Sequence, residues 1–203
     1  MGFLLDPAKR TQTEVRRVAG ERLGSAVALL DQACNGADTD LERAVHDVRK
    51  RCKATRGLIR LVAPELGDDA ATVDRLVRGA ANELSSLRDA HAVLDSIDAL
   101  IATQPAVNDP QLLAVRAHHE AVVLGSATVA ARGDALVAAR TLLDDAHRIS
   151  QHWHLPDGYD AVAGGLADTY RSGRRALRAA QANPTNDQLH QWRKAAKYLW
   201  YQT

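Results

Sequence analysis

Two segments of the chain place a histidine and several cations along one side of a predicted helix. The first reads His46-x-x-Arg49-Lys50-x-x-Lys53-x-x-Arg56, and the second reads His190-x-x-Arg193-Lys194-x-x-Lys197. Residues three and four apart are neighbours on a helix, so each segment forms a basic ridge. Arginine offers phosphate oxygens a planar pair of donors, lysine a point charge and histidine a directional donor. A ridge of this kind suits a repeating polyanion better than a single small metabolite.

The two segments resemble each other beyond their charges. An apolar residue precedes each histidine, and a capping box lies upstream of each, at 39–42 and at 185–188. The two histidines are 144 residues apart. A basic pattern that recurs in one register, with the same flanking signals, favours an internal duplication.

A third basic stripe precedes the second histidine. It has the spacing i, i+3, i+4 and i+7 with no acidic residue between its members, which are Arg171, Arg174, Arg175 and Arg178. Like charges on one helix face cost a few tenths of a kcal/mol per pair. The stripe is therefore interpreted as a supporting anion site, with an ordinary solvated surface as the alternative.

The net charge of the chain conceals this segregation. The 203 residues include 26 Lys and Arg against 25 Asp and Glu, for a net charge of +1. However, residues 43–60 and 171–203 each carry seven basic residues and one acidic residue. Two strongly basic segments in an otherwise acidic chain point to an anionic partner that the total charge does not reveal.

Helices are the elements that must position these ridges. Good helix formers fill the stretches between the prolines, and alternating β-branched residues are scarce. We predict an all-α fold, an antiparallel helical bundle with short connections. The predicted helices span 7–33, 40–63, 69–102, 110–152 with a break near Gly133, 158–182 and 185–203.

The sequence resembles the CHAD domain family, the conserved histidine α-helical domains. The pattern H-x-x-R-K-x-x-K occurs in both halves as in that family, and Leu87-Arg88-Asp89 is similar to its arginine-aspartate motif. The resemblance implies two pseudo-symmetric four-helix halves, here residues 1–155 and 156–203. It also implies a basic central surface that binds inorganic polyphosphate without catalysis. Only 13 residues follow His190, so we expect the second half to be incomplete.

Transferred position by position, the resemblance gives the expected polyphosphate-binding residues. Those of the first half are His46, Arg49, Lys50, Lys53 and Arg56. Those of the second half are His190, Arg193, Lys194 and Lys197, with Arg171, Arg174, Arg175 and Arg178 as supporting candidates.

Other chemistry is less well supported by the residues. We find no Ser/His/Asp set, no glycine-rich phosphate loop and no metal-ligand spacing, so we expect no enzyme activity, no metal and no cofactor. Cys52 leans toward the apolar side of its helix and is interpreted as structural. Trp153, Tyr159 and Tyr170 are interpreted as packing residues.

Two alternative functions stay open: a helical nucleic-acid-binding protein and, with less support, an enzyme acting on phosphorylated compounds. Nucleic acid is thus expected at least as a competitor. No apolar run is long enough to span a membrane and no secretory signal is visible. We therefore expect a cytoplasmic monomer or homodimer, associated with polyphosphate granules and without membrane contact.

Overall fold

The described part of the protein is built from helices alone. The computed structural model describes residues 4–35, 41–103, 110–125 and 129–202, without the side chains of 86–93, 95, 122–125 and 129–131. The helices are α1 (Thr11–Cys34), α2 (Leu41–Leu66), α3 (Asp68–Glu83), α4 (Ser85–Thr103), α5 (Pro110–Gly125), α6 (Val129–Ser150), α7 (Asp160–Ala182) and α8 (Asn186–Gln202). The prediction of an all-α fold is confirmed.

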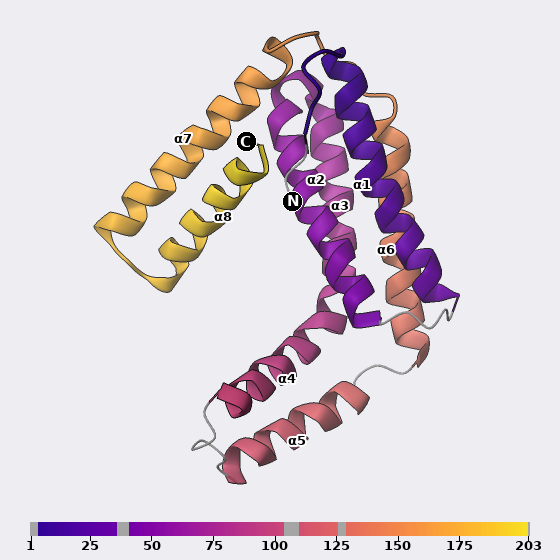
Figure 1. The fold of residues 1–203 in the computed structure, drawn as a ribbon, viewed down its shortest axis with the longest axis vertical. Coiled ribbons are helices and arrows are strands. Elements are labelled where there is room, and N and C mark those ends of the chain that lie inside the picture. Colours follow the sequence, from indigo (N-terminus) through magenta and orange to yellow (C-terminus); the bar gives the residue numbers. More distant parts are fainter. Residues whose placement is uncertain (1–3, 36–40, 104–109, 126–128, 203) are drawn as a thin grey trace.

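Helices α1, α2, α3 and α6 form a four-helix bundle that holds the main core (Figure 1). Each contributes apolar side chains at helical spacing, among them Leu23, Val48, Val77 and Leu143, which are all fully or almost fully buried. Burial of such a face supplies most of the stability of a helix in a protein. The bundle is therefore a rigid support for whatever packs on its outside.

Two helical hairpins extend from this bundle, α4–α5 and α7–α8 (Figure 1). The α7–α8 hairpin packs against α2, which brings the two histidine-containing helices together. Two glycines permit this close approach. A Cβ on Gly165 of α7 would lie 2.0 Å from the Leu61 carbonyl oxygen of α2, and one on Gly57 of α2 would lie 2.8 Å from the Cβ of Tyr201.

The prediction of one helix over 69–102 is wrong, because the helix is interrupted at Leu84. This side chain is fully buried in the core, and the new helix α4 begins directly after it. The Ser85 hydroxyl donates a hydrogen bond to the Asn82 carbonyl oxygen at 2.7 Å. A serine hydroxyl that satisfies a carbonyl at a helix end competes with continuation of the helix.

Two further boundaries differ from the prediction. Gly133 lies inside α6 and not at a break, since α5 ends at Gly125 and α6 begins at Val129. At the N-terminus, α1 begins at Thr11, and the Asp6 carboxylate accepts the Ala8 N–H at 3.0 Å in a preceding turn. The predicted cap is present there, but it closes a turn and not the helix.

The second predicted capping box can be inspected, whereas residues 36–40 of the first lie outside the described part. The Gln188 N–H donates to the Thr185 hydroxyl at 3.3 Å at the start of α8, as the sequence predicts. The side chains of the Leu87-Arg88-Asp89 motif also lie outside the description.

The three aromatic residues interpreted as packing residues have different environments. Trp153 is completely buried, but Tyr159 and Tyr170 are 68% and 50% exposed, so that interpretation is wrong for both tyrosines. The division into two four-helix halves at residues 155 and 156 stays a prediction. In the described residues, no helix combines the length and apolar character needed to cross a membrane.

Candidate anion-binding site

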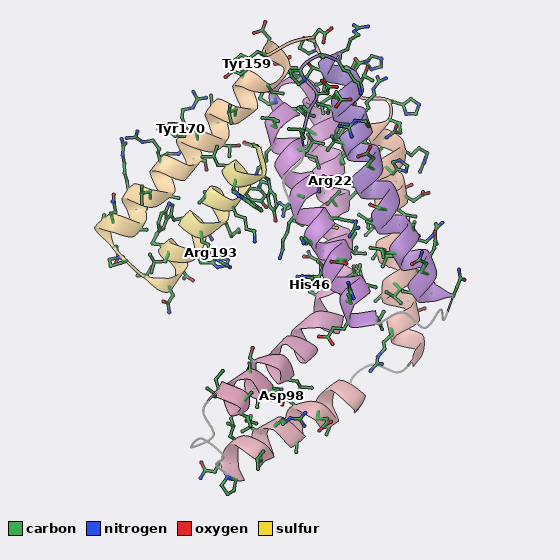
Figure 2. The ribbon with its side chains drawn as sticks, in the orientation of Figure 1. Arg22, His46, Asp98, Tyr159, Tyr170 and Arg193 are labelled. Carbon is green, nitrogen blue, oxygen red and sulfur yellow. The ribbon has the colours of Figure 1, made fainter. Side chains whose placement is uncertain are left out.

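The two basic ridges meet in a groove between α2 and α8. Lys53 and Arg56 reach it from α2, although most of its lining comes from α8, more than 130 residues later in the sequence. The groove has a volume of about 290 Å³ and is called the α2–α8 groove below. Its lining residues are Lys53, Arg56, His190, Arg193, Lys194, Lys197, Tyr198 and Tyr201. Arg193 on α8 and His46 near the start of α2 are labelled in Figure 2.

The lining of the α2–α8 groove is strongly cationic. It contains five Lys and Arg side chains and one histidine, and no carboxylate lines it in the described part of the protein. The α8 cations Arg193, Lys194 and Lys197 are exposed to solvent. Several cations that converge on a groove with no carboxylate in its lining create a positive potential that attracts anions.

One carboxylate supports the α2 wall of the groove from α3. Asp74 accepts two hydrogen bonds from Arg56, at 2.7 Å from Nε and 3.3 Å from Nη2. Arg60 and Arg78 also approach it, at 3.9 and 3.7 Å. Burial has the largest single effect on the pKa of Arg56 and lowers it, but the hydrogen bonds to Asp74 and the electrostatic effects of Tyr198 and Asp74 together raise the net pKa. A single carboxylate balances three guanidinium groups, so this wall retains excess positive charge.

Tyr198 forms the junction between α8 and the arginines of α2. The Arg60 guanidinium carbon lies 3.8 Å from the centre of the Tyr198 ring, and that of Arg56 lies at 5.9 Å. Such cation–π contacts contribute roughly 0.5–2 kcal/mol each. The contact therefore fixes α8 to α2 and occupies one face of the tyrosine ring.

Arg49 does not line the groove, although its position in the motif predicts a ligand contact. It is half-buried, and its Nη1 donates to the backbone carbonyl oxygen of Ala81 near the end of α3. The last carbonyls of a helix have no partner within the helix, and cationic side chains can satisfy them. In this structure, Arg49 is thus a contact between α2 and α3.

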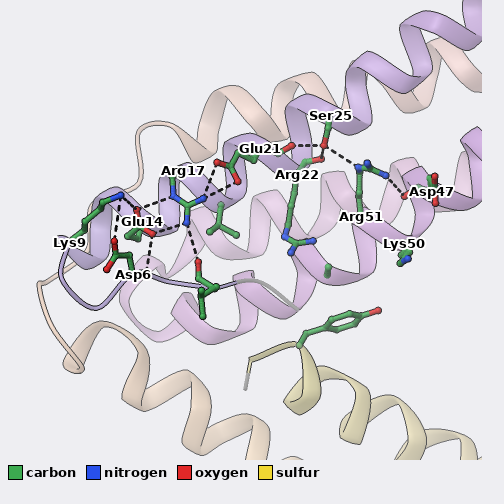
Figure 3. A pocket seen from close by; sticks show the side chains of 14 residues that line it. Asp6, Lys9, Glu14, Arg17, Glu21, Arg22, Ser25, Asp47, Lys50 and Arg51 are labelled. Carbon is green, nitrogen blue, oxygen red and sulfur yellow. Dashed lines mark hydrogen bonds and ion pairs between the residues drawn. The ribbon is translucent and has the colours of Figure 1, made fainter. Parts of the chain in front are cut away.

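His46 and Lys50 are exposed on α2 but also lie outside the α2–α8 groove. Lys50 lines a second pocket of about 790 Å³, which is bounded by the N-terminal segment, α1, α2 and Tyr201 (Figure 3). Tyr201 lines both pockets, so they adjoin at the end of α8.

The second pocket has mixed charge, unlike the α2–α8 groove. Arg51 donates from Nε to the Ser25 hydroxyl at 3.1 Å, and Arg22 points into the same pocket (Figure 3). Burial and the nearby Arg51 lower the pKa of Arg22. Four carboxylates share the lining, namely Asp6, Glu14, Glu21 and Asp47. The acidic neighbours make this pocket a weaker anion site than the groove.

The predicted arginine stripe on α7 does not join the α2–α8 groove. None of its four members lines that groove: Arg171, Arg174, Arg175 and Arg178. Arg171 pairs with Asp168 one turn earlier, and Arg174 donates to the Tyr170 hydroxyl at 3.4 Å. Arg175 lines a separate pocket of about 540 Å³, which Tyr198 also lines.

Cys52 is buried in the bundle core, which confirms its structural interpretation. Burial raises the pKa of its thiol to about 12, against smaller opposing effects of Arg49 and the other nearby cations. A thiol with such a pKa is inert at neutral pH.

Asp74 and Tyr198 are the site residues that the sequence prediction missed. Asp74 lies on α3 and Arg56 on α2, so no spacing rule within one helix connects the two residues. Tyr198 directly follows Lys197, and its position beside the ridge was the one available signal.

The chain was compared with known families, curated proteins and solved structures. A family model described as "CHAD domain" matches residues 3–73 and 21–203. No curated protein matches the chain, and no solved structure matches it.

Proposed function

Because the chain belongs to the CHAD domain family, we propose that it binds inorganic polyphosphate in the α2–α8 groove and catalyses no reaction. The observation that carries this proposal is the convergence of cations from both histidine helices on one groove with no carboxylate among its described lining residues. Family membership agrees with binding of this general kind, and the cationic lining of the groove supports the proposed location.

The groove suits a linear polyanion in its chemistry. Lys53 and Arg56 face the groove from one helix, and four cationic or imidazole side chains of α8 face it from the other. Successive phosphates of one chain can therefore contact both walls. Such binding releases several counterions at once, so the affinity falls steeply as the salt concentration rises.

Nucleic acid is the less favoured ligand. Binding of single strands without sequence preference relies on aromatic side chains on which bases stack. In the groove, Tyr198 already stacks on Arg60. The exposed Trp192 and Trp200 do not line the groove. An enzyme of phosphoryl transfer is also disfavoured, because metal-holding carboxylates normally serve that chemistry and none lines the described groove.

Without a catalytic centre, such a module would act where polyphosphate accumulates, and we propose cytoplasmic polyphosphate granules as its location.

The proposal is tested by binding isotherms for long-chain polyphosphate at low and high salt, with tripolyphosphate and duplex DNA as competitors. The double variant Lys194→Gln/Lys197→Gln is expected to lose about tenfold or more in affinity, because charged hydrogen bonds contribute roughly 1.5–3 kcal/mol each. The matched control is Arg75→Gln/Arg148→Gln, which removes the same charge from exposed positions on α3 and α6.

Equal losses in both double variants would show that net charge, and not the groove, determines the affinity. Displacement of polyphosphate by DNA of equal charge would favour the nucleic-acid function. Release of phosphate in the presence of a divalent metal would contradict the proposed absence of catalysis.

A further inference from the structure

The charges of the second pocket, which has a volume of about 790 Å³, are separated into two ends (Figure 3). At the end near the N-terminal segment, Glu14 and Glu21 both accept hydrogen bonds from Arg17. At the same end, a carboxylate oxygen of Asp6 lies 3.6 Å from the Lys9 ammonium. Cations therefore already balance most of the negative charge at this end.

The opposite end of the second pocket has an excess of positive charge. Arg22 of α1 meets Lys50 and Arg51 of α2 there (Figure 3). Asp47 is the one carboxylate among the described residues that line this end. Neither Arg22 nor Arg51 is a defining residue of the histidine motif, so the motif does not predict this convergence.

The two arginines at the basic end are half-buried and repel each other. Burial is the main cause that lowers the pKa of Arg22, and the nearby Arg51 guanidinium lowers it further. Arg51 donates to the Ser25 hydroxyl at 3.1 Å and to the Asp47 backbone carbonyl at 3.4 Å, and both of these acceptors are neutral. An anion bound between two such like charges relieves their repulsion, and the partly buried setting strengthens its attraction to them.

This basic end adjoins the α2–α8 groove along two helices. On α2, Lys50 of the pocket and Lys53 of the groove are three residues apart and are therefore neighbours on the helix surface. On α8, Tyr201 lines both cavities and is only 5% exposed. Burial is the main cause that raises the pKa of Tyr201, so its hydroxyl keeps its proton at neutral pH and can donate a hydrogen bond to an anion.

We propose that the basic end of the second pocket is an extension subsite, in which Arg22 and Arg51 hold phosphates of a polyphosphate chain that continues from the groove past Tyr201. This inference rests on the proposed function and adds that the affinity depends on chain length. A short chain such as tripolyphosphate occupies the groove, whereas a longer chain contacts both cavities. Contacts of one chain with adjoining sites reinforce each other, because the second binding event is intramolecular.

The test compares the affinities of tripolyphosphate and long-chain polyphosphate, measured by titration calorimetry. We expect Arg22→Gln/Arg51→Gln to lose about tenfold or more in affinity for the long chain and less than about twofold for tripolyphosphate. The matched control is again Arg75→Gln/Arg148→Gln, which removes the same charge from exposed positions and should change both affinities by less than about twofold. Denaturant unfolding verifies that each variant is folded.

A variant with the opposite expected effect guards against a loss that comes only from misfolding. Asp47→Asn keeps the size of the side chain but removes the carboxylate from the basic end. The affinity for long-chain polyphosphate should therefore rise by about threefold, and the affinity for tripolyphosphate should stay unchanged. A partly unfolded protein does not produce such a selective gain.

The groove variant Lys194→Gln/Lys197→Gln separates this inference from the proposed function. If the groove variant weakens both ligands while Arg22→Gln/Arg51→Gln weakens neither, or weakens both equally, the proposed function stands and the extension subsite is wrong. An Asp47→Asn variant whose affinity for the long chain is unchanged or lower would also contradict the subsite. If the wild type binds neither ligand, the proposed function itself fails and the inference fails with it.

Discussion

The α1–α2 and α7–α8 hairpins carry the same basic motif but use it differently. Arg49 and Arg193 occupy equivalent positions 144 residues apart. Arg49 is half-buried and bonded to the Ala81 carbonyl, whereas Arg193 is exposed and lines the α2–α8 groove. The motif supplies the charge, but the neighbouring helices decide whether that charge stabilises the fold or faces a ligand.

The apolar faces of the two hairpins differ in the same way. Val48 of α2 is completely buried, and its equivalent on α8, Trp192, is 39% exposed. The first hairpin is held inside a four-helix bundle, while the second depends on its contact with α2 at Gly57 and Gly165. The comparison indicates that the groove depends on the packing of the α7–α8 hairpin against α2, which includes the stacking of Tyr198 on Arg60.

The largest effect is expected from separating the two hairpins with Gly165→Ala. The new Cβ would lie 2.0 Å from the Leu61 carbonyl oxygen, so α7 must move away from the α2 backbone. Forced overpacking of this kind costs about 1–3 kcal/mol. We expect a lower midpoint of thermal unfolding and at least about a tenfold loss of polyphosphate affinity, because the groove needs both helices.

Gly173→Ala is the matched control on the same helix. A Cβ at Gly173 meets nothing within 4 Å, and alanine is favoured over glycine in helices by up to about 1 kcal/mol. This variant should bind normally and unfold at the same or a higher temperature. Normal binding by Gly165→Ala would show that the groove does not depend on this helix contact.

The next largest effect compares the two equivalent arginines directly. Arg193→Gln should weaken polyphosphate binding several-fold to tenfold and leave the unfolding free energy nearly unchanged, since Arg193 is exposed. Arg49→Gln should do the reverse, with a loss of about 1–2 kcal/mol in stability and little change in affinity, because it removes the bond to Ala81.

Denaturant unfolding measures the unfolding free energy of both variants, and binding isotherms measure their affinity for polyphosphate. Arg49→Gln could instead weaken polyphosphate binding as much as Arg193→Gln while its unfolding free energy stays at the wild-type value. In that case the position in the motif, and not the neighbouring helices, would determine what each arginine does.

The ridges themselves could be predicted because helical spacing depends only on sequence. The pattern around His190 predicts a basic face on α8, and the structure places Arg193, Lys194 and Lys197 in the groove. The pairing of Arg56 with Asp74 was not predictable in this way. It depends on how α3 lies against α2, and the sequence contains no local signal for that packing.

The all-α fold class was also predictable, because helical spacing depends only on sequence. The interruption of the helix at Leu84 was not predictable. Residues 80–103 contain neither glycine nor proline, which are the usual signals of a helix end. The helix ends there because Leu84 is fixed in the core and Ser85 bonds to the Asn82 carbonyl. Tertiary packing overrode local propensity at this point.

A smaller effect is expected from acidification, and one source of it is Glu14 of α1. Glu14 is buried and accepts hydrogen bonds from Arg17 and from the Asp6 N–H, which hold its pKa at about 2, below the ordinary 4.5. Its stabilising effect is complete above pH 4.5 and is lost as the pH falls toward 2. The position 144 residues later is Gly158, which has no acid group to titrate.

The midpoint of thermal unfolding should therefore fall between pH 4.5 and 2 more steeply in the wild type than in Glu14→Gln. The variant should be less stable at neutral pH, where the wild-type carboxylate is charged and paired. Identical pH profiles for the two proteins would exclude Glu14 as a source of the acid sensitivity.

The smallest effect leaves stability unchanged and reports only how well the core face of α2 is covered. Cys52 is 2% exposed and its thiol has a pKa of about 12, whereas Cys34 at the end of α1 is exposed. Since the thiolate is the reactive form, a thiol reagent at neutral pH should label one cysteine quickly in the native protein and two in denaturant. In Cys34→Ser, no rapid labelling should remain. Rapid labelling of Cys52 would mean that α2 is not sealed in the bundle, and the contrast between the buried Val48 of α2 and the exposed Trp192 of α8 would then be lost.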